Sequence, residues 1–434
     1  MFQTLKNAWK VPELKSKLLF TLVIVILYRI GSVLPVPYVS ADVMNSFNEA
    51  AAGSIFQYLN ILSGDAFARA TLFALGVSPY ITSSIVIQLL TIAIPALERL
   101  AKEGDEGKKK LTALTRLVTV GLALITAIGY ALFLKNGING QSMLVPGTNA
   151  FHLIVIIACY CAGAALVMWL AEKINENGIG NGISMILFAG IVSRGPALVS
   201  SLWYMMFKDG KFSIIGLLLV ILSLVITLAV VGFVVFMTHS ERRIPIQYAK
   251  KVVGRKMYGG QASNLPIKLN MSGVMPIIFA NSIVAIPATI AAFFPNSKFW
   301  SGVNNFFNYT SPVYAILFFA LIIAFAYFYI AISFNPVEVA NNLKKNGGSI
   351  PGIRPGRPTT EYITRVLNRI TLIGAIFLGV IAVFPMIINM VSGGQFAGLA
   401  FGGSSLLIVV GVALETTRDL EAQMSLRHYK GFLE

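Results

Sequence analysis

Few residues in this 434-residue sequence could do covalent or metal chemistry, and they are poorly placed for it. Cys159 and Cys161 stand two positions apart, so a helix turns them to different faces and neither a disulfide nor a metal pair is expected. The histidines His152, His239 and His428 are widely scattered. The sequence has no GxxxxGK[ST] phosphate loop, which excludes ATP hydrolysis of that kind. We therefore expect a protein that is not an enzyme and that holds no metal or cofactor.

Most of the chain consists of long apolar runs, and the elements that position its polar residues must be built from these runs. Hydrophobic residues make up 56% of the chain and charged residues only 12%, about half the share usual in soluble domains. Ten runs are each long enough, or nearly so, for a helix to cross about 30 Å of hydrocarbon. A strand-built barrel would show short alternating segments instead, so we expect an all-α polytopic membrane protein with ten transmembrane helices. The runs cover residues 18–34, 71–94, 114–134, 151–171, 183–203, 213–238, 271–294, 313–333, 370–391 and 401–416.

The distribution of charge orients this bundle. Ten crossings put both termini on one side, and the loops of that side hold 27 of the 34 Lys and Arg residues, against six in the opposite loops. This asymmetry follows the positive-inside rule, so both termini are expected in the cytoplasm. We expect no cleavable signal peptide, because no short apolar region ends in a small-residue cleavage site. Arg29 lies near the end of the first run, where its side chain is expected to extend outward to the interface.

The acidic residues bear on which kind of membrane protein this is. All 18 Asp and Glu residues lie in loops, at the ends of runs, or in the short polar segment 58–70. Ion-coupled transporters usually hold a carboxylate near the middle of the membrane, so this distribution argues against a symporter or antiporter. A secondary transporter with an inverted repeat and a purely structural scaffold stay open as alternatives. Paired glycines at 393–394 and 402–403 argue only weakly against the scaffold, because glycine also lets helices approach closely.

Two basic loops are expected to face the cytoplasm, at residues 239–269 and 334–369. In the second, three prolines alternate with glycines between positions 351 and 358, which predicts turns. Topology alone and anionic lipids would explain the charge of such loops. The turn-rich order around Arg354 favours docking of an acidic or phosphate-rich partner instead. The basic residues predicted to dock are Arg242, Arg243, Lys250, Lys251, Arg255, Lys256, Arg354 and Arg357.

Two further patterns concern the organisation of the runs. Runs 71–94 and 271–294 each have a proline at the start (Pro79 and Pro276), then small polar residues, then Ser-Ile-Val, which suggests a five-plus-five inverted repeat. Segment 58–70, "YLNILSGDAFARA", leads directly into the second run. It is too short and too polar to cross a membrane, and we expect a short helix there.

Four stretches carry a resemblance to a known family: "GIGNGIS" (178–184), "RRIPIQYAKK" (242–251), "NLKKNGG" with "PGIRPG" (342–356), and "FGGSSLLIVV" (401–410). They occur in the order and spacing of the SecY family, whose members are channel subunits of the protein translocon, and the loop around Arg354 resembles bacterial members most. The resemblance covers essentially the whole chain. It implies two inverted five-helix halves that form a clamshell around a central pore, closed on the outside by a short plug.

The resemblance also implies site residues, by matching motif to motif. An aliphatic ring that constricts the pore would consist of Val77, Ile81, Ile183, Leu187, Ile278 and Ile408. The plug segment, residues 58–70, would act through Tyr58, Leu59, Leu62, Ser63, Gly64, Asp65, Phe67 and Arg69. A lateral gate that releases apolar segments into lipid would be bridged by the polar groups of Gln88, Asn281 and Ser282, with Ile286 beside them. Taken singly, each aliphatic position would be an ordinary core or lipid-facing residue.

The implied function is a protein-conducting channel of the Sec translocon, without an energy source of its own. It would pass unfolded secretory polypeptides across the membrane and release transmembrane segments sideways into lipid. Implied partners are a SecA ATPase, the ribosome, SecE-like and SecG-like membrane subunits, substrates with signal sequences, and anionic lipids. The location would be the bacterial plasma membrane. The expected organisation is a cytoplasmic N-terminal segment 1–17, five-helix halves 18–203 and 204–416, and a cytoplasmic C-terminal tail 417–434.

Overall fold

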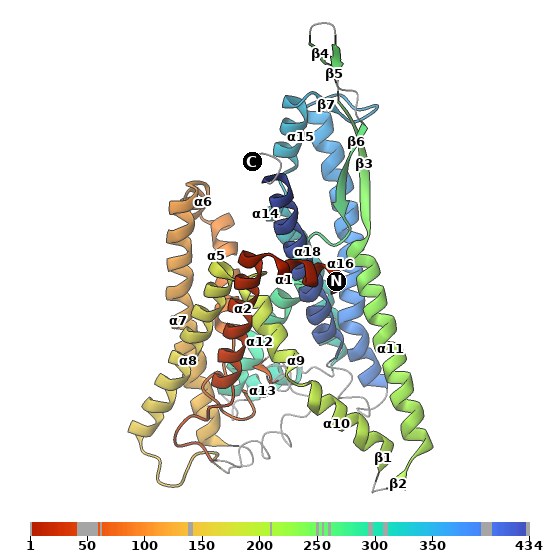
Figure 1. Cartoon of the computed structure of the whole chain (residues 1–434). Coiled ribbons are helices and arrows are strands. Elements are labelled where there is room, and N and C mark those ends of the chain that lie inside the picture. Colours follow the sequence, from red (N-terminus) through yellow and green to blue (C-terminus); the bar gives the residue numbers. More distant parts are fainter. Residues whose placement is uncertain are drawn as a thin grey trace.

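The computed structural model describes residues 2–40, 60, 63–137, 142–208, 211–248, 251–253, 256–258, 262–293, 298–306, 311–391 and 402–430. Helices dominate these residues (Figure 1). The helices of the first part are α1 (Phe2–Lys10), α2 (Pro12–Gly31), α5 (Ser78–Ala93), α6 (Pro95–Lys102), α7 (Asp105–Asn136), α8 (Ala150–Asn177), α9 (Gly182–Val192) and α10 (Gly195–Met206). Those of the second are α11 (Ile214–His239), α12 (Met275–Phe293), α13 (Lys298–Phe306), α14 (Pro312–Ser333), α15 (Pro336–Lys345), α16 (Arg357–Val391) and α18 (Gly402–Lys430).

Among the described residues, fewer helices are long and apolar enough to cross a membrane than the sequence predicts. Within the described residues, six helices are long and apolar enough to cross a membrane, or seven if α5 and α6, bent by 103° from each other, count as one span. Helices α2, α12 and α18 coincide with the other predicted runs, but they do not meet the same criteria of length and apolar character. The chain is thus a mainly helical multi-pass membrane protein, and the ten crossings stay a prediction.

The helices gather in two groups. In Figure 1, α2, α5, α7 and α8 stand on one side and α11, α14, α16 and α18 on the other, with α9 and α12 between them. Helix α12 packs against α5 and α7 of the first group, and α9 packs against α18 of the second. Side chains from both groups join in one large buried cluster. The central elements α9 and α12 therefore connect the two groups.

The second predicted run does not become helical at its start. Residues 71–77 form turns, with the amide of Gly76 bonded to the carbonyl of Phe73, and α5 begins only at Ser78. Gly76 has φ +56°, a left-handed conformation that ends helical geometry, and Pro79 suits the first turn of the helix that follows. Of the short helix expected over the plug segment, the described residues show helical conformation only at Asn60 and Ser63. Residues 64–70 are turns, because Gly64 and Asp65 both have left-handed φ, +65° and +69°.

The two basic loops meet in a small sheet. Strands β3 (Glu241–Tyr248) and β6 (Ala262–Lys268) pair antiparallel, and β7 (Gly348–Ser349), from the second loop, pairs with the end of β3. Ile244 and Ile246 alternate inward and pack with residues of α15 and α16. A second hairpin, β4 (Lys251–Val253) with β5 (Lys256–Tyr258), projects beyond the ends of the helices in Figure 1. Strands β1 (Phe207–Lys208) and β2 (Lys211–Phe212) join α10 to α11.

Candidate functional site

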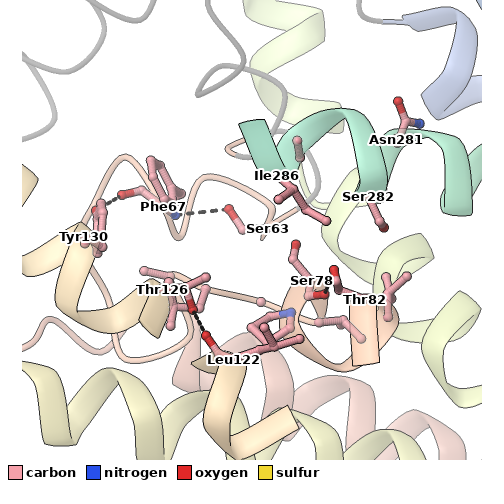
Figure 2. Close-up of a pocket in the computed structure, with 18 of the residues that line it drawn as sticks. Ser63, Phe67, Ser78, Thr82, Leu122, Thr126, Tyr130, Asn281, Ser282 and Ile286 are labelled. Carbon is pink, nitrogen blue, oxygen red and sulfur yellow. Dashed lines mark hydrogen bonds between the residues drawn. The ribbon is translucent and has the colours of Figure 1, made fainter. Parts of the chain in front are cut away.

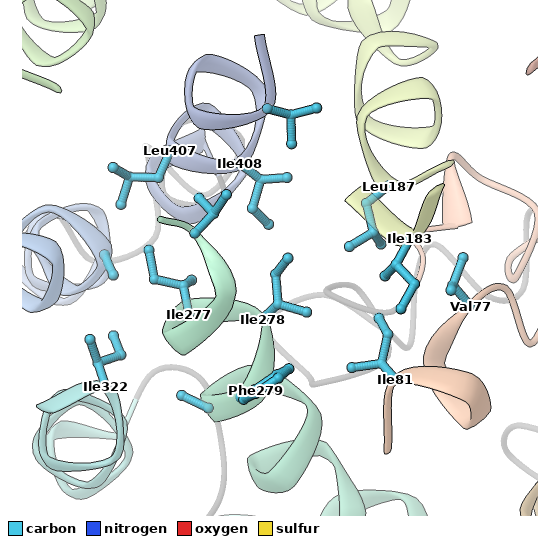
Figure 3. Close-up of a cluster of buried hydrophobic side chains, with 14 of the residues drawn as sticks. Val77, Ile81, Ile183, Leu187, Ile277, Ile278, Phe279, Ile322, Leu407 and Ile408 are labelled. Atoms are coloured by element: carbon cyan, nitrogen blue, oxygen red, sulfur yellow. The ribbon is translucent and has the colours of Figure 1, made fainter. Parts of the chain in front are cut away.

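The six residues predicted to form the aliphatic ring lie together in the structure. They come from four separate elements: the start of α5, α9, α12 and α18. None is more than 8% exposed, and all belong to the same buried cluster. Figure 3 shows Ile81, Ile183, Leu187, Ile278 and Ile408 facing one another, while Ile277, next to Ile278 on α12, points away toward Ile322. Because their side chains carry no donor, acceptor or charge, they can exclude water but cannot bind a polar group.

Local chemistry fixes the position of α9, which carries Ile183 and Leu187. The side chain of Asn181 accepts hydrogen bonds from the amides of Ile183 and Ser184 and so caps the helix. At Gly182, an added β-carbon would lie 1.9 Å from the carbonyl oxygen of Ala171, so only glycine lets α9 start this close to α8. The glycine-rich stretch 178–184 is therefore a tight turn ahead of a helix, as its sequence predicts, and not a phosphate loop.

Beside the ring, a cavity of about 340 Å³ opens between α5, α7 and α12 (Figure 2). Its walls are mainly apolar, with hydroxyl groups from Thr82, Thr126 and Ser282 at intervals. Ser63 and Phe67 of the plug segment close it at one end. The ring residues that line it are Val77, Ile81, Leu187, Ile278 and Ile408.

The polar residues predicted to bridge the lateral gate do not bridge it here. Gln88 donates to the hydroxyl of Ser84 on its own helix, and Ser282 donates to the carbonyl of Ile278 on its own helix. Asn281 is 3% exposed, and its Nδ2 has no hydrogen-bond partner among the described residues. Ile286 lines the cavity. The predicted gate helices α5 and α12 do pack together, but within the described residues none of the bonds of Gln88, Asn281 or Ser282 crosses between them.

The described part of the plug segment, residues 60 and 63–70, is folded around Asn60. The side chain of Asn60 donates to the Asp65 carboxylate at 2.9 Å and accepts from the Ala68 amide at 2.8 Å. The hydroxyl of Ser63 accepts from the amide of Phe67. Arg69 is exposed. Three residues predicted to act here, Tyr58, Leu59 and Leu62, lie outside the described residues.

Residues of other helices hold this segment in place. The hydroxyl of Tyr130 on α7 donates to the carbonyl of Phe67, and that of Tyr160 on α8 donates to the carbonyl of Ala70 at 3.4 Å. Arg29 Nη1 donates to the carbonyl of Gly64 at 3.3 Å. Arg29 thus turns toward the plug segment and does not simply extend to the interface as the sequence suggests.

Four residues thus anchor the plug segment, and the sequence identified none of them as an anchor, although Arg29 stands out as a cation in an apolar run. The fourth is Arg194, between α9 and α10. Its Nε lies 3.2 Å from Asp65 Oδ1 in an ion pair.

The basic residues predicted to dock a partner lie on the sheet and turns beyond the helix ends. Arg242 and Arg354 are exposed. Arg243 pairs with Glu241, and Arg357 pairs with Glu361, both at the surface. Lys251 and Lys256 fall on β4 and β5, whereas Lys250 and Arg255 lie outside the described residues.

Three kinds of comparison relate this chain to known proteins. The sequence model of the SecY family matches residues 71–417. The protein translocase subunit SecY of Streptomyces galbus is 43% identical over 444 residues, and the alignment covers all of both chains. A solved structure described as a protein-conducting channel superposes with a TM-score of 0.65 at 20% identity, covering 94% of this chain and 92% of the other. Sec61 from the canine ribosome-channel complex of the endoplasmic reticulum gives 0.61 at 19% identity, with the same coverage.

Proposed function

Because the chain belongs to the SecY family and is a channel subunit of protein translocase, we propose that unfolded polypeptides pass through its aliphatic ring. The chain is a protein-conducting channel and not an enzyme. The observation that carries the proposal is the meeting of six buried aliphatic side chains from four elements. A channel for unfolded chains must accept every kind of side chain, and aliphatic groups bind none of them tightly. When closed, such a constriction excludes water and ions.

The plug segment and the lateral gate complete this proposal. The plug segment closes the ring from one side, which the contact of Ser63 and Phe67 with the cavity supports. An apolar segment leaves sideways between α5 and α7 on one side and α12 and α14 on the other. Among the described residues, Gln88, Asn281 and Ser282 make no polar bridge across this seam, which supports a gate that opens at low cost. The channel has ten crossings in two inverted halves, 18–203 and 204–416, and the gathering of the helices into two groups supports the division into halves (Figure 1).

We further propose the surroundings in which the channel works. The charge distribution supports cytoplasmic termini, and the similarity to bacterial relatives supports a bacterial plasma membrane. A SecA-like ATPase and the ribosome supply the energy and dock at the exposed Arg242 and Arg354, and a related channel, Sec61, was solved with a ribosome. SecE-like and SecG-like subunits and anionic lipids complete the assembly.

A crosslink tests the path of the polypeptide. In a chain with Cys159→Ser and Cys161→Ser, Ile278→Cys is reconstituted with its partner subunits, and a secretory polypeptide carrying one cysteine is arrested halfway. We expect a disulfide between the two cysteines. Ile277→Cys is the matched control, since Ile277 is fully buried but points away from the ring, and it should form none. If ring positions fail to link while positions in the basic loops do, the chain docks substrates without threading them and works as a scaffold.

A further inference from the structure

Helix α9 touches two parts of the proposed channel, one at each end. Its first turns carry Ile183 and Leu187 of the aliphatic ring. Its last turn and the break that follows meet the plug segment. A β-carbon added at Gly64 would lie 2.7 Å from the Gly190 carbonyl oxygen and 2.7 Å from the Ser193 hydroxyl oxygen. Since α9 is one uninterrupted helix of 11 residues, a movement at either end is carried to the other.

An ion pair joins this helix end to the plug segment. Arg194 follows α9 directly, and its Nε lies 3.2 Å from Asp65 Oδ1. The two side chains are only 27% and 20% exposed, so solvent screens their attraction less than that of a surface pair. The same Nε makes no hydrogen bond among the described residues, so its link to the carboxylate is electrostatic. The side-chain amide of Asn60 donates a hydrogen bond to the same Oδ1 and so helps to orient the carboxylate.

At Gly64 the plug segment packs directly against the end of α9, with no room for a side chain between them. Gly64 has φ +65°, and Arg29 bonds its carbonyl oxygen while α9 covers the position that a side chain would take. The plug segment therefore rests on backbone at the end of α9, with Arg194 beside it.

We propose that Asp65 and Arg194 form a latch that ties the plug segment to α9, so that widening of the ring and release of the plug segment occur as one event. A polypeptide that pushes Ile183 and Leu187 outward shifts α9 and pulls Arg194 from Asp65. Conversely, loss of the ion pair makes the ring easier to widen. The inference rests on the proposed roles of the ring and the plug segment.

The basal ion conductance of the full complex, reconstituted in liposomes without polypeptide, tests the latch. Asp65→Asn and Arg194→Gln should each raise it about fivefold, as expected for the loss of a partly buried ion pair. The charge swap Asp65→Arg with Arg194→Asp should bring it back to within about twofold of the original. Lys135→Gln is the matched control, because it removes one exposed cation at the end of α7, and it should change nothing.

A second measurement reads the ring directly. With the native cysteines replaced, cysteines at Ile81 and Ile183, neighbours across the ring in Figure 3, are oxidised to a disulfide. Arg194→Gln should slow this reaction several-fold, and Lys135→Gln should not. An unchanged rate together with raised conductance would mean that Arg194 holds the plug segment without coupling it to the ring, which overturns the inference.

A deletion separates failure of the latch from failure of the proposed plug. If deletion of residues 63–70 raises conductance while Asp65→Asn and Arg194→Gln do not, the plug stands and the latch is wrong. If the deletion also leaves the conductance unchanged, both the proposed plug and the latch are wrong. Raised conductance that the charge swap fails to restore would show that Arg194 acts through packing and not as a charge partner, which also rejects the latch.

Discussion

The hydroxyl of Tyr130, near the end of α7, donates a hydrogen bond to the backbone carbonyl of Phe67 in the plug segment, and the two rings pack with centroids 4.5 Å apart. We therefore expect Tyr130→Phe to loosen the plug segment while keeping the ring contact. The carbonyl of Phe67 would be left buried without its donor, a penalty of about 1–3 kcal/mol. Basal ion conductance of the reconstituted channel should rise roughly tenfold.

Tyr160→Phe is the control for this prediction. Its hydroxyl bonds the neighbouring carbonyl of Ala70 at 3.4 Å, near the limit for a hydrogen bond, so much less is lost. An equal increase in conductance for both variants would mean that the Tyr130 bond has no special part in holding the plug segment.

The Nδ2 of Asn281, which has no hydrogen-bond partner in the part of the chain that the structure describes, predicts a change in signal selectivity. Replacing a buried polar group that has no partner by an apolar one of similar size removes a desolvation penalty and stabilises the packed state. Asn281→Leu should therefore favour the closed arrangement of α5 and α12. Translocation of substrates whose signal sequences are only weakly hydrophobic should fall several-fold, while strongly hydrophobic signals still open the gate.

A graded series of signal sequences measures this shift. Ser282→Ala serves as control, because the Ser282 hydroxyl bonds the carbonyl of Ile278 on its own helix and contributes little across the gate. The same threshold of hydrophobicity in Asn281→Leu and in the unchanged chain would refute the predicted role of Asn281.

The aliphatic ring could be anticipated only through the resemblance, because each of its positions taken singly is typical of an ordinary core residue. Ile183 and Leu187 stand four residues apart and share one face of α9, whereas Val77 directly precedes α5, which carries Ile81. Each pair lies beside a recognisable Pro or Gly motif. What no spacing reveals is that these faces meet those of Ile278 and Ile408, and here the resemblance supplied the pairing that the fold then displays.

The anchors of the plug segment could not be anticipated in the same way. Tyr130 and Phe67 are 63 residues apart, and a tyrosine in an apolar run has no visible partner until the helices pack. The turns at Gly64 and Asp65 did leave a signal, since Ser-Gly-Asp is typical turn sequence that argues against a helix continuing beyond Ser63. The small sheet also left a signal in the sequence, because Ile244 and Ile246 alternate with polar residues and a proline.

The ion pair between Glu172 on α8 and Arg116 on α7 predicts a loss of stability without a change of function. The guanidinium makes two contacts with the carboxylate, Nε to Oε1 at 3.0 Å and Nη2 to Oε2 at 2.8 Å. The Glu172 side chain is 9% exposed, whereas that of Arg116 is 49% exposed, so solvent weakens the pair. Glu172→Gln should lower the free energy of unfolding by about 1 kcal/mol.

Thermal unfolding in detergent would measure this as a lower midpoint temperature. Glu176→Gln, on the same helix, removes a surface pair with Lys173 and should leave the midpoint unchanged. Equal midpoints for all three chains would show that the link between α7 and α8 contributes nothing to stability.

The exposed guanidinium of Arg354 predicts the site at which an energy source acts. Arg354 lies in the turns before α16, and the Thr359 hydroxyl bonds its carbonyl, so the backbone there is ordered while the charge faces outward. Arg354→Glu reverses that charge without touching the core. We expect translocation driven by the SecA-like motor to fall at least tenfold, with the protein still folded and inserted, because an acidic or phosphate-bearing partner surface would be repelled.

Lys10→Glu makes the same change of charge at the exposed end of α1, far from this turn in sequence, and should leave translocation nearly intact. Arg357→Glu should have an intermediate effect, since Glu361 already offsets the charge of Arg357. The decisive reading is the ratio of translocation to motor binding measured on the same vesicles. If binding and translocation both survive in Arg354→Glu, the turn is not the docking site, and the basic residues of β3 become the ones to test.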